Sequence, residues 1–169
     1  MPYRLVCIAL VLFGASSTFA HEPSVMLASG QVPLTHISIG FDMGPVGRLA
    51  ATELQHYLEQ LGGPRLPIME CHAYPDSGAI VLRVRRDEDA RAADESAFRL
   101  VTRDHVALVE GASEYAVLIG VYDLLERLGC RWLGPGAESL PPMDAVAIPL
   151  LDVAQTPSFR WRGLELISG

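Results

Sequence analysis

Histidines are the first candidates for metal binding or acid–base chemistry, but their spacing fits no ligand motif. They lie at positions 21, 36, 56, 72 and 105, and no HExxH or comparable pair occurs. The glycine-rich turn at 134–136 reads Gly-Pro-Gly, without the Lys or Ser/Thr that a nucleotide phosphate needs. No GxSxG nucleophile motif is present either. We therefore expect no metal site and no cofactor.

Carboxylates could act in pairs, since two acids that flank one bond can cleave it by acid–base catalysis. Three of them, Asp87, Glu88 and Asp89, lie in the charged stretch 85–95, where mixed signs are typical of a solvated loop. Four more are expected on helix faces opposite the apolar stripes, where acids are normally solvated: Glu53, Glu59, Asp123 and Glu126. The sequence predicts no catalytic residue in this chain.

The first twenty residues read as a secretory signal peptide. One positive charge at Arg4 precedes an apolar run from Leu5 to Phe13, and small residues lead up to Ala20. The run is too short to span a bilayer, which takes roughly 20 residues. We therefore expect export to the periplasm or beyond, with no membrane attachment after cleavage. Residues 21–35 are expected to form a flexible lead-in.

Export bears on the two cysteines beyond the signal peptide, Cys71 and Cys130, because it decides whether they can form a disulfide. An oxidising compartment permits a disulfide between them, and two buried free thiols are the alternative. The sequence does not decide between the disulfide and the free thiols.

Hydrophobic periodicity predicts the order strand, helix, strands, hairpin, helix, strand. Val46, Leu49, Leu54 and Leu58 recur at helical spacing after Pro45 and predict one buried stripe, and Gly62 is placed to end that helix. In the second helix Ser113 is placed to cap the start and Gly129 the end. The predicted helices cover 45–61 and 112–129, the strands 36–41, 65–70, 78–84 and 130–133, the hairpin 97–111 with its turn at 103–104, the loop 134–142 and the extended chain 145–151.

These elements predict an α+β fold, a two-layer sandwich of two main helices on a mixed sheet of about five strands, over residues 36–156. The chain has 169 residues, which fits one such domain. Its formal net charge of -7 argues against a nucleic-acid partner, because phosphate binding needs a basic face.

Three segments resemble the non-catalytic N-terminal domain of certain glycoside hydrolases, namely bacterial β-N-acetylhexosaminidases and α-glucuronidases. They read ATELQHYLEQLGGPRLPI at 51–68, EYAVLIGVYDLLERLGCRWLGPG at 114–136 and PSFRWRGLE at 157–165. The run from Tyr122 to Gly136 is the most specific part. The resemblance implies a small α/β sandwich that packs against a catalytic (β/α)-barrel.

The same resemblance implies that residues 157–169 are the linker and first strand of that barrel, with the rest of the barrel absent from this chain. It matches Arg162 to an arginine that reaches sugar hydroxyls, and a simple charge at a strand edge is the alternative. Trp132 and Trp161 could stack on a sugar, but we favour core packing for Trp132 and packing against the barrel for Trp161.

Three hypotheses follow for the function. The first is an exported accessory domain of a polysaccharide-degrading glycoside hydrolase, without activity of its own, whose partner is the catalytic barrel. The second is a free-standing periplasmic module that binds an oligosaccharide or a protein. The third, a complete small enzyme, is disfavoured because nothing in the sequence organises its carboxylates.

Overall fold

The structure is a computed structural model that describes residues 25–29, 32–33, 35–86, 94–103 and 105–156. The predicted signal peptide, most of the charged stretch 85–95, Trp161, Arg162 and the whole segment 157–169 lie outside these residues.

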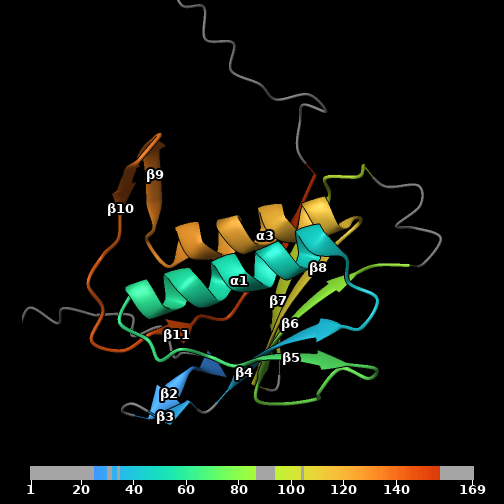
Figure 1. Cartoon of the computed structure of the whole chain (residues 1–169), viewed down its shortest axis with the longest axis horizontal. Coiled ribbons are helices and arrows are strands. Elements are labelled where there is room, and N and C mark those ends of the chain that lie inside the picture. Colours follow the sequence, from blue (N-terminus) through green and yellow to red (C-terminus); the bar gives the residue numbers. More distant parts are fainter. Residues whose placement is uncertain (1–24, 30–31, 34, 87–93, 104, 157–169) are drawn as a thin grey trace, which may run out of the picture.

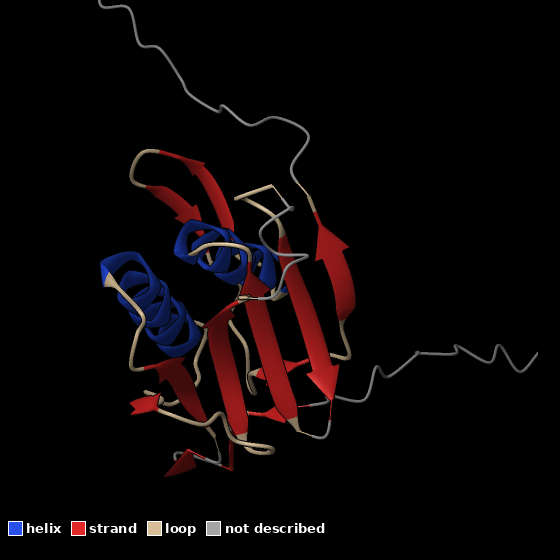
Figure 2. Cartoon of the chain, turned by 90° about the vertical axis from the view of Figure 1, so that its right-hand side faces the viewer, coloured by secondary structure: helices blue, strands red, loops and turns tan. Residues whose placement is uncertain are grey.

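The described residues form two layers, a six-stranded sheet and a pair of helices on one of its faces (Figures 1 and 2). The helices are α1 (Pro45–Gln60) and α3 (Glu114–Arg127). The strands, in their order across the sheet, are β12 (Asp152–Gln155), β7 (Phe98–Arg103), β8 (Val106–Gly111), β6 (Ala79–Val84), β4 (His36–Gly40) and β5 (Ile68–Cys71). The predicted α+β two-layer sandwich with a mixed sheet is confirmed.

Four neighbouring strands run in the same direction. β4 pairs in parallel with both β5 and β6, and β6 pairs in parallel with β8. β7 runs antiparallel to β8 through the predicted hairpin, and β12 runs antiparallel to β7. The carboxyl ends of β5, β4, β6 and β8 therefore meet at one edge of the sheet, which is where open α/β sheets form their binding crevices.

The helix boundaries follow the predicted capping residues. Pro45 occupies the first turn of α1, and the Oγ atom of Ser113 accepts a 3.1 Å hydrogen bond from the backbone N–H of Ala116 at the start of α3. Gly62 and Gly129 follow the two helices with φ of 101° and 99°, a left-handed conformation that glycine adopts without a steric penalty.

The core lies between the helices and the sheet. Fully buried aliphatic side chains from both layers fill it, among them Ile37, Ile39, Leu54, Leu58, Ile80, Leu82, Leu100, Val121, Leu124 and Leu125. α3 approaches the sheet closely at Gly120, where a Cβ atom would lie 2.9 Å from Val109 and 3.3 Å from Phe98. The residue at this helix position must therefore be small.

Several strands differ from the prediction. The sheet gains β12 at Asp152–Gln155, just beyond the extended chain predicted at 145–151. The predicted loop 134–142 contains β10 (Ala137–Ser139), which forms a hairpin with β9 (Arg131–Gly134). β12 is short and partly polar, so it lacks the run of apolar residues by which a buried strand is recognised.

The prediction of a loosely held lead-in is wrong for the part of residues 21–35 around Val25 and Leu27. Val25 and Leu27 are fully buried, and β1 (Val25–Met26) pairs with β11 (Ala147–Ile148). A second small ladder joins β2 (Ala28–Ser29) to β3 (Val32–Pro33). The apolar run of Val25, Met26 and Leu27 is too short a pattern to show burial in advance.

Candidate functional site

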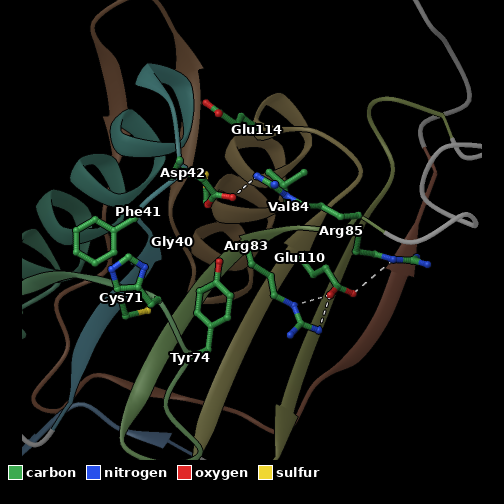
Figure 3. Close-up of a pocket in the computed structure, with 13 residues that line it drawn as sticks. Gly40, Phe41, Asp42, Cys71, Tyr74, Arg83, Val84, Arg85, Glu110 and Glu114 are labelled. Atoms are coloured by element: carbon green, nitrogen blue, oxygen red, sulfur yellow. Dashed lines mark hydrogen bonds and ion pairs between the residues drawn. The ribbon is translucent and has the colours of Figure 1, made fainter.

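A cavity of about 650 Å³ lies at the edge where the parallel strands end (Figure 3). Because Ile39, Leu82 and Val109 point into the core, their neighbours Gly40, Arg83 and Glu110 face the side of the sheet that bears no helix. The cavity opens on that side and continues over the sheet edge to the start of the helices. Its lining is Gly40, Phe41, Asp42, Met43, Cys71, His72, Tyr74, Arg83, Val84, Arg85, Arg86, Glu110 and Glu114.

Arginine and carboxylate side chains dominate one wall of the cavity. Glu110 is only 8% exposed, and its Oε1 atom lies 2.6 Å from both Nε and Nη2 of Arg83. Its Oε2 atom lies 3.8 Å from Nε of Arg85, so two guanidinium groups share one carboxylate (Figure 3). Arg86 pairs with Asp42 nearby. The trio of Glu110, Arg83 and Arg85 carries a net charge of one positive unit.

The opposite wall is aromatic. The rings of Phe41 and His72 stack with centroids 4.1 Å apart and 22° between their planes, and Phe41 is 50% exposed. Tyr74 lies between this stack and Arg83 (Figure 3), with its hydroxyl against Gly40: a Cβ atom there would be 2.8 Å from the Tyr74 oxygen. Burial, and then the charge of Asp42, raise the pKa of Tyr74, so its hydroxyl stays protonated at neutral pH.

Glu114 lines the end of the cavity that lies next to the helices. Its two carboxylate oxygens accept hydrogen bonds from the backbone N–H groups of Gly44, at 2.7 Å, and Gly47, at 2.9 Å. Gly44 is the N-cap of α1 and has no side chain to do this. One carboxylate from α3 therefore occupies the anion position at the start of α1, where the helix dipole favours negative charge.

Cys71 and Cys130, both described, are free thiols. The Sγ atom of Cys71 lies 3.0 Å from Oγ of Ser38 at the rim of the cavity. Cys130 is buried behind α3, and this burial raises the pKa of its thiol. The disulfide that the sequence left open is not formed in this structure.

A second cluster of aromatic residues lies over the seam between α1 and α3. The Nε1 atom of Trp132 donates to the hydroxyl of Tyr57 at 2.9 Å, and that hydroxyl donates to Glu138 of the β9–β10 hairpin at 2.9 Å. Tyr122 stands edge-on to Trp132, with centroids 4.8 Å apart, and donates to Oε2 of Glu53 at 2.7 Å. The prediction that Trp132 packs against the core is confirmed.

Burial raises the pKa of both tyrosines in this cluster. For Tyr122 the hydrogen bond to Glu53 raises it further, and for Tyr57 the hydrogen bond from Trp132 partly offsets the rise. Glu53 thus joins the two helices rather than being a solvated acid, as its place on the helix had suggested. The cluster attaches the β9–β10 hairpin to the helix layer.

The outer surface of the helix layer exposes apolar side chains near the N-terminal ends of both helices. Leu49 on α1 is 48% exposed and Tyr115 on α3 is 57% exposed, both opposite the buried stripes of their helices. The prediction that helical spacing places these two side chains in the buried stripes is therefore wrong. Val46 on α1 is exposed as well. We call Val46, Leu49 and Tyr115 the outer helix patch.

The sequence named one residue of the cavity, Cys71, and only as a possible disulfide partner, while its one binding candidate, Arg162, lies outside the described residues. The sequence does contain a pattern that is typical of a site at a sheet edge, because polar residues follow the predicted strands 36–41 and 78–84 directly, at Asp42 and Arg85. This pattern predicts a shared site only if the two strands are parallel, and the sequence did not establish their direction. In the described part of the chain no three His, Cys, Asp or Glu side chains gather where they could hold a metal ion. No helix there is long and apolar enough to cross a membrane.

Comparisons by sequence find no match, either among protein-family models or among curated proteins. Comparison with solved structures does find matches. The fold is similar to part of a family GH115 4-O-methyl-α-glucuronidase with specificity for decorated arabinogalactans, with a TM-score of 0.54 and 16% identity. That likeness covers 81% of this chain and 19% of the glucuronidase.

Two hexosaminidases from Streptomyces are also similar in fold. The GH20 β-N-acetylhexosaminidase of Streptomyces coelicolor A3(2) and the N-acetyl-β-hexosaminidase of Streptomyces plicatus each match with a TM-score of 0.50 and 20% identity. Each likeness covers 83% of this chain and 26% of the hexosaminidase. The resemblance predicted from the sequence is confirmed as a likeness of fold. The chain has the fold of a domain that glycoside hydrolases contain beside the larger remainder of their chains.

Proposed function

We propose that this chain is an accessory, non-catalytic domain of an exported glycoside hydrolase and packs against the catalytic domain of that enzyme. One observation carries the proposal: the fold likeness covers 81–83% of this chain but only 19–26% of the hydrolases it matches. A unit that is shared almost whole, by enzymes several times its size, is expected to support their chemistry from outside the catalytic domain.

The outer helix patch supports the proposal as the docking surface. Exposed apolar side chains that gather on one face favour contact with another protein surface, since burying them removes apolar area from water. Leu49 and Tyr115 come from two different helices, and the contact of Glu114 with Gly44 joins the starts of those helices. The starts of the two helices are therefore held together before any partner binds.

The chemistry of the cavity also agrees with a supporting role. Asp42 pairs with Arg86, Glu110 with Arg83 and Arg85, and Glu114 with two backbone N–H groups. Each carboxylate of the cavity is thus engaged by positive partners or donors. This arrangement suits fixed recognition of a ligand better than the proton transfers of glycoside cleavage.

The proposal extends to both ends of the sequence. Residues 1–20 direct export, so sequencing the N-terminus of the exported protein should find it to begin near His21. Residues 157–169 lead into the first strand of the catalytic barrel, where Arg162 reaches sugar hydroxyls bound beside the catalytic acids. These two statements rest on the sequence pattern and on the resemblance.

Turnover assays test the non-catalytic role. The purified chain is incubated with chromogenic aryl N-acetyl-β-glucosaminides and aryl α-glucuronides, the two classes that the structural relatives suggest. The expected result is no hydrolysis above the protein-free rate. Multiple turnovers that Glu110→Gln or Asp42→Asn abolishes would make the cavity an active site and overturn the proposal. The variant Glu59→Gln, on the outer surface of α1, is the matched control for loss of a carboxylate.

A further inference from the structure

The cavity at the sheet edge has no part in the docking role, yet it has the size and construction of a ligand site. Its volume of about 650 Å³ falls within the roughly 300–1,000 Å³ of small-molecule sites, and one or two sugar rings would fit it. It joins a flat aromatic wall to a wall of charged groups, with a hydroxyl between them.

Arg83 gives the cavity a guanidinium group that has N–H donors available for a ligand. Its Nε and Nη2 atoms both point at Oε1 of Glu110, and its Nη1 atom has no hydrogen bond or ion pair with any described residue. The side chain is 41% exposed, so a ligand can reach it. A guanidinium group offers five N–H donors in a plane, which suits two oxygens of a carboxylate or two adjacent hydroxyls.

Tyr74 provides the second polar contact. Its hydroxyl lies against Gly40 and, among the described residues, has no hydrogen-bond partner. It remains protonated, because burial raises its pKa, so it can donate to a ligand oxygen and accept from a ligand hydroxyl. Only a residue without a side chain at position 40 leaves room for this placement.

The stacked pair of Phe41 and His72 provides the apolar contact. Both residues line the cavity, and Phe41 is half exposed, so part of the stacked pair is open to a ligand. The C–H face of a sugar ring can cover such a surface, which removes apolar area from water without losing the hydroxyl contacts at the ring edge.

The charged groups of the cavity favour some classes of ligand over others. The Nη1 atom of Arg83, which has no partner among the described residues, can bind one anionic group of a ligand. A nucleotide fits less well, because Glu114 already occupies the backbone N–H groups of Gly44 and Gly47 that could receive a phosphate. Asp42 and Glu114 would also repel a polyphosphate.

We infer that this cavity binds a sugar acid, a pyranose that bears one carboxylate. In this binding mode Arg83 contacts the carboxylate, Tyr74 and Asp42 contact ring hydroxyls, and the Phe41–His72 stack covers the apolar face of the ring. The site would give the domain a recognition role of its own, separate from the docking role of the outer helix patch. It does not depend on that role.

Titration of the purified chain with D-glucuronate and D-galacturonate, followed by calorimetry and by NMR of backbone amides, tests the inference. We expect saturable binding of at least one of them with a dissociation constant at or below about 1 mM, with shifts at Gly40, Tyr74 and Glu110. Neutral glucose and galactose should bind at least about tenfold more weakly, because the charge-assisted hydrogen bond to Arg83 is lost. Inorganic phosphate should not compete.

Variants locate the site. Arg83→Gln and Phe41→Ala should each weaken binding at least about tenfold, and Gly40→Ala should do so by displacing the Tyr74 hydroxyl. Arg127→Gln, which removes an arginine paired with Asp123 on α3, is the matched control and should bind like the unmodified chain. Circular dichroism must show each variant to be folded. The three substitutions remove different contacts, so one folded variant is enough to test whether the ligand binds in this cavity.

Three results would overturn the inference. They are the absence of saturable binding of either sugar acid up to about 10 mM, equal binding by Arg83→Gln, and displacement of the sugar acid by phosphate at equal concentration. The last would indicate a simple anion site. None of them bears on the absence of glycosidase turnover, so the inference and the proposed function can fail separately.

Discussion

The carboxylate of Glu114, in the first turn of α3, accepts hydrogen bonds from the backbone N–H of Gly44 at 2.7 Å and from that of Gly47 at 2.9 Å. A side chain of the second helix thus caps the first, across 70 residues of sequence. The carboxylate lies near the N-terminal ends of both helices, where both dipoles favour a negative charge. This contact fixes the starts of the two helices relative to each other, and with them the end of the cavity.

Replacing Glu114 should therefore destabilise the domain. Glu114→Gln removes the charge and leaves one of the two N–H groups without an acceptor, since an amide has one oxygen. We expect a loss of about 1–2 kcal/mol in the free energy of unfolding, as for removal of other N-terminal caps. Chemical denaturation measures this loss. Glu126→Gln, on the exposed C-terminal turn of α3, is the control and should lose nothing. Equal stability of Glu114→Gln and the unmodified chain would contradict this role.

Tyr122 should make stability fall at alkaline pH. Burial and the hydrogen bond to Glu53 raise its pKa in the folded state above its usual value of about 10. The unfolded chain therefore loses this proton first. The stabilising effect is complete below about pH 10 and is lost as the pH rises toward the folded-state pKa. Tyr57 and Tyr74, whose pKa values are also raised, act in the same direction.

The variant Tyr122→Phe isolates this contribution. At neutral pH it should lose about 1 kcal/mol through the missing hydrogen bond. Above about pH 10 its free energy of unfolding should fall less steeply than that of the unmodified chain. Denaturation midpoints over a series of pH values measure both effects, and Tyr115→Phe, on the exposed side of α3, controls for loss of a hydroxyl at neutral pH. Parallel curves above pH 10 would show that Tyr122 ionises alike in both states.

Gly120 should be intolerant of larger side chains. The Cβ atom of Gly120→Ala would lie 2.9 Å from Val109 and 3.3 Å from Phe98, so α3 must move away from the sheet. The gain of roughly 1 kcal/mol in helix propensity opposes a packing cost of about 1–3 kcal/mol. We expect a small net loss for Gly120→Ala and a clearly larger one for Gly120→Val, measured as melting temperatures. A rise in melting temperature for both variants would show that the interface has room.

The sequence predicted the layers because the features that define them are local. Helical spacing of leucines, the caps Ser113 and Gly129, and the β-branched run of β6 each act within a few residues. The cavity could not be predicted in this way. It depends on β4, β6 and β8 being parallel neighbours, which brings Gly40, Arg83 and Glu110 into one row.

The same reason explains the missed contacts of single residues. Glu53 looked like a solvated helix acid and the sequence did not single out Glu114, but their partners are Tyr122 and Gly44 of the other helix. The burial of Val25 and Leu27 depends likewise on the distant β11. Pairings across the fold decide these roles, and a single sequence records no pairings.

The outer helix patch should bind apolar probes. The double variant Leu49→Ser with Tyr115→Ser removes its two most exposed side chains. We expect a lower fluorescence of an apolar dye such as ANS and less self-association in sedimentation, because apolar area is removed from water contact. Leu150→Ser, at a comparably exposed apolar position between β11 and β12, is the control and should change neither. Equal effects of the two changes would show that the patch has no special role.

The most direct test of the accessory role is to sequence the genomic DNA that follows the codon for Gly169. The account expects that DNA to encode, in the same or another frame, the remaining strands and helices of a glycoside hydrolase barrel that continue from residues 157–169. A following sequence that encodes no catalytic domain in any frame would contradict the account.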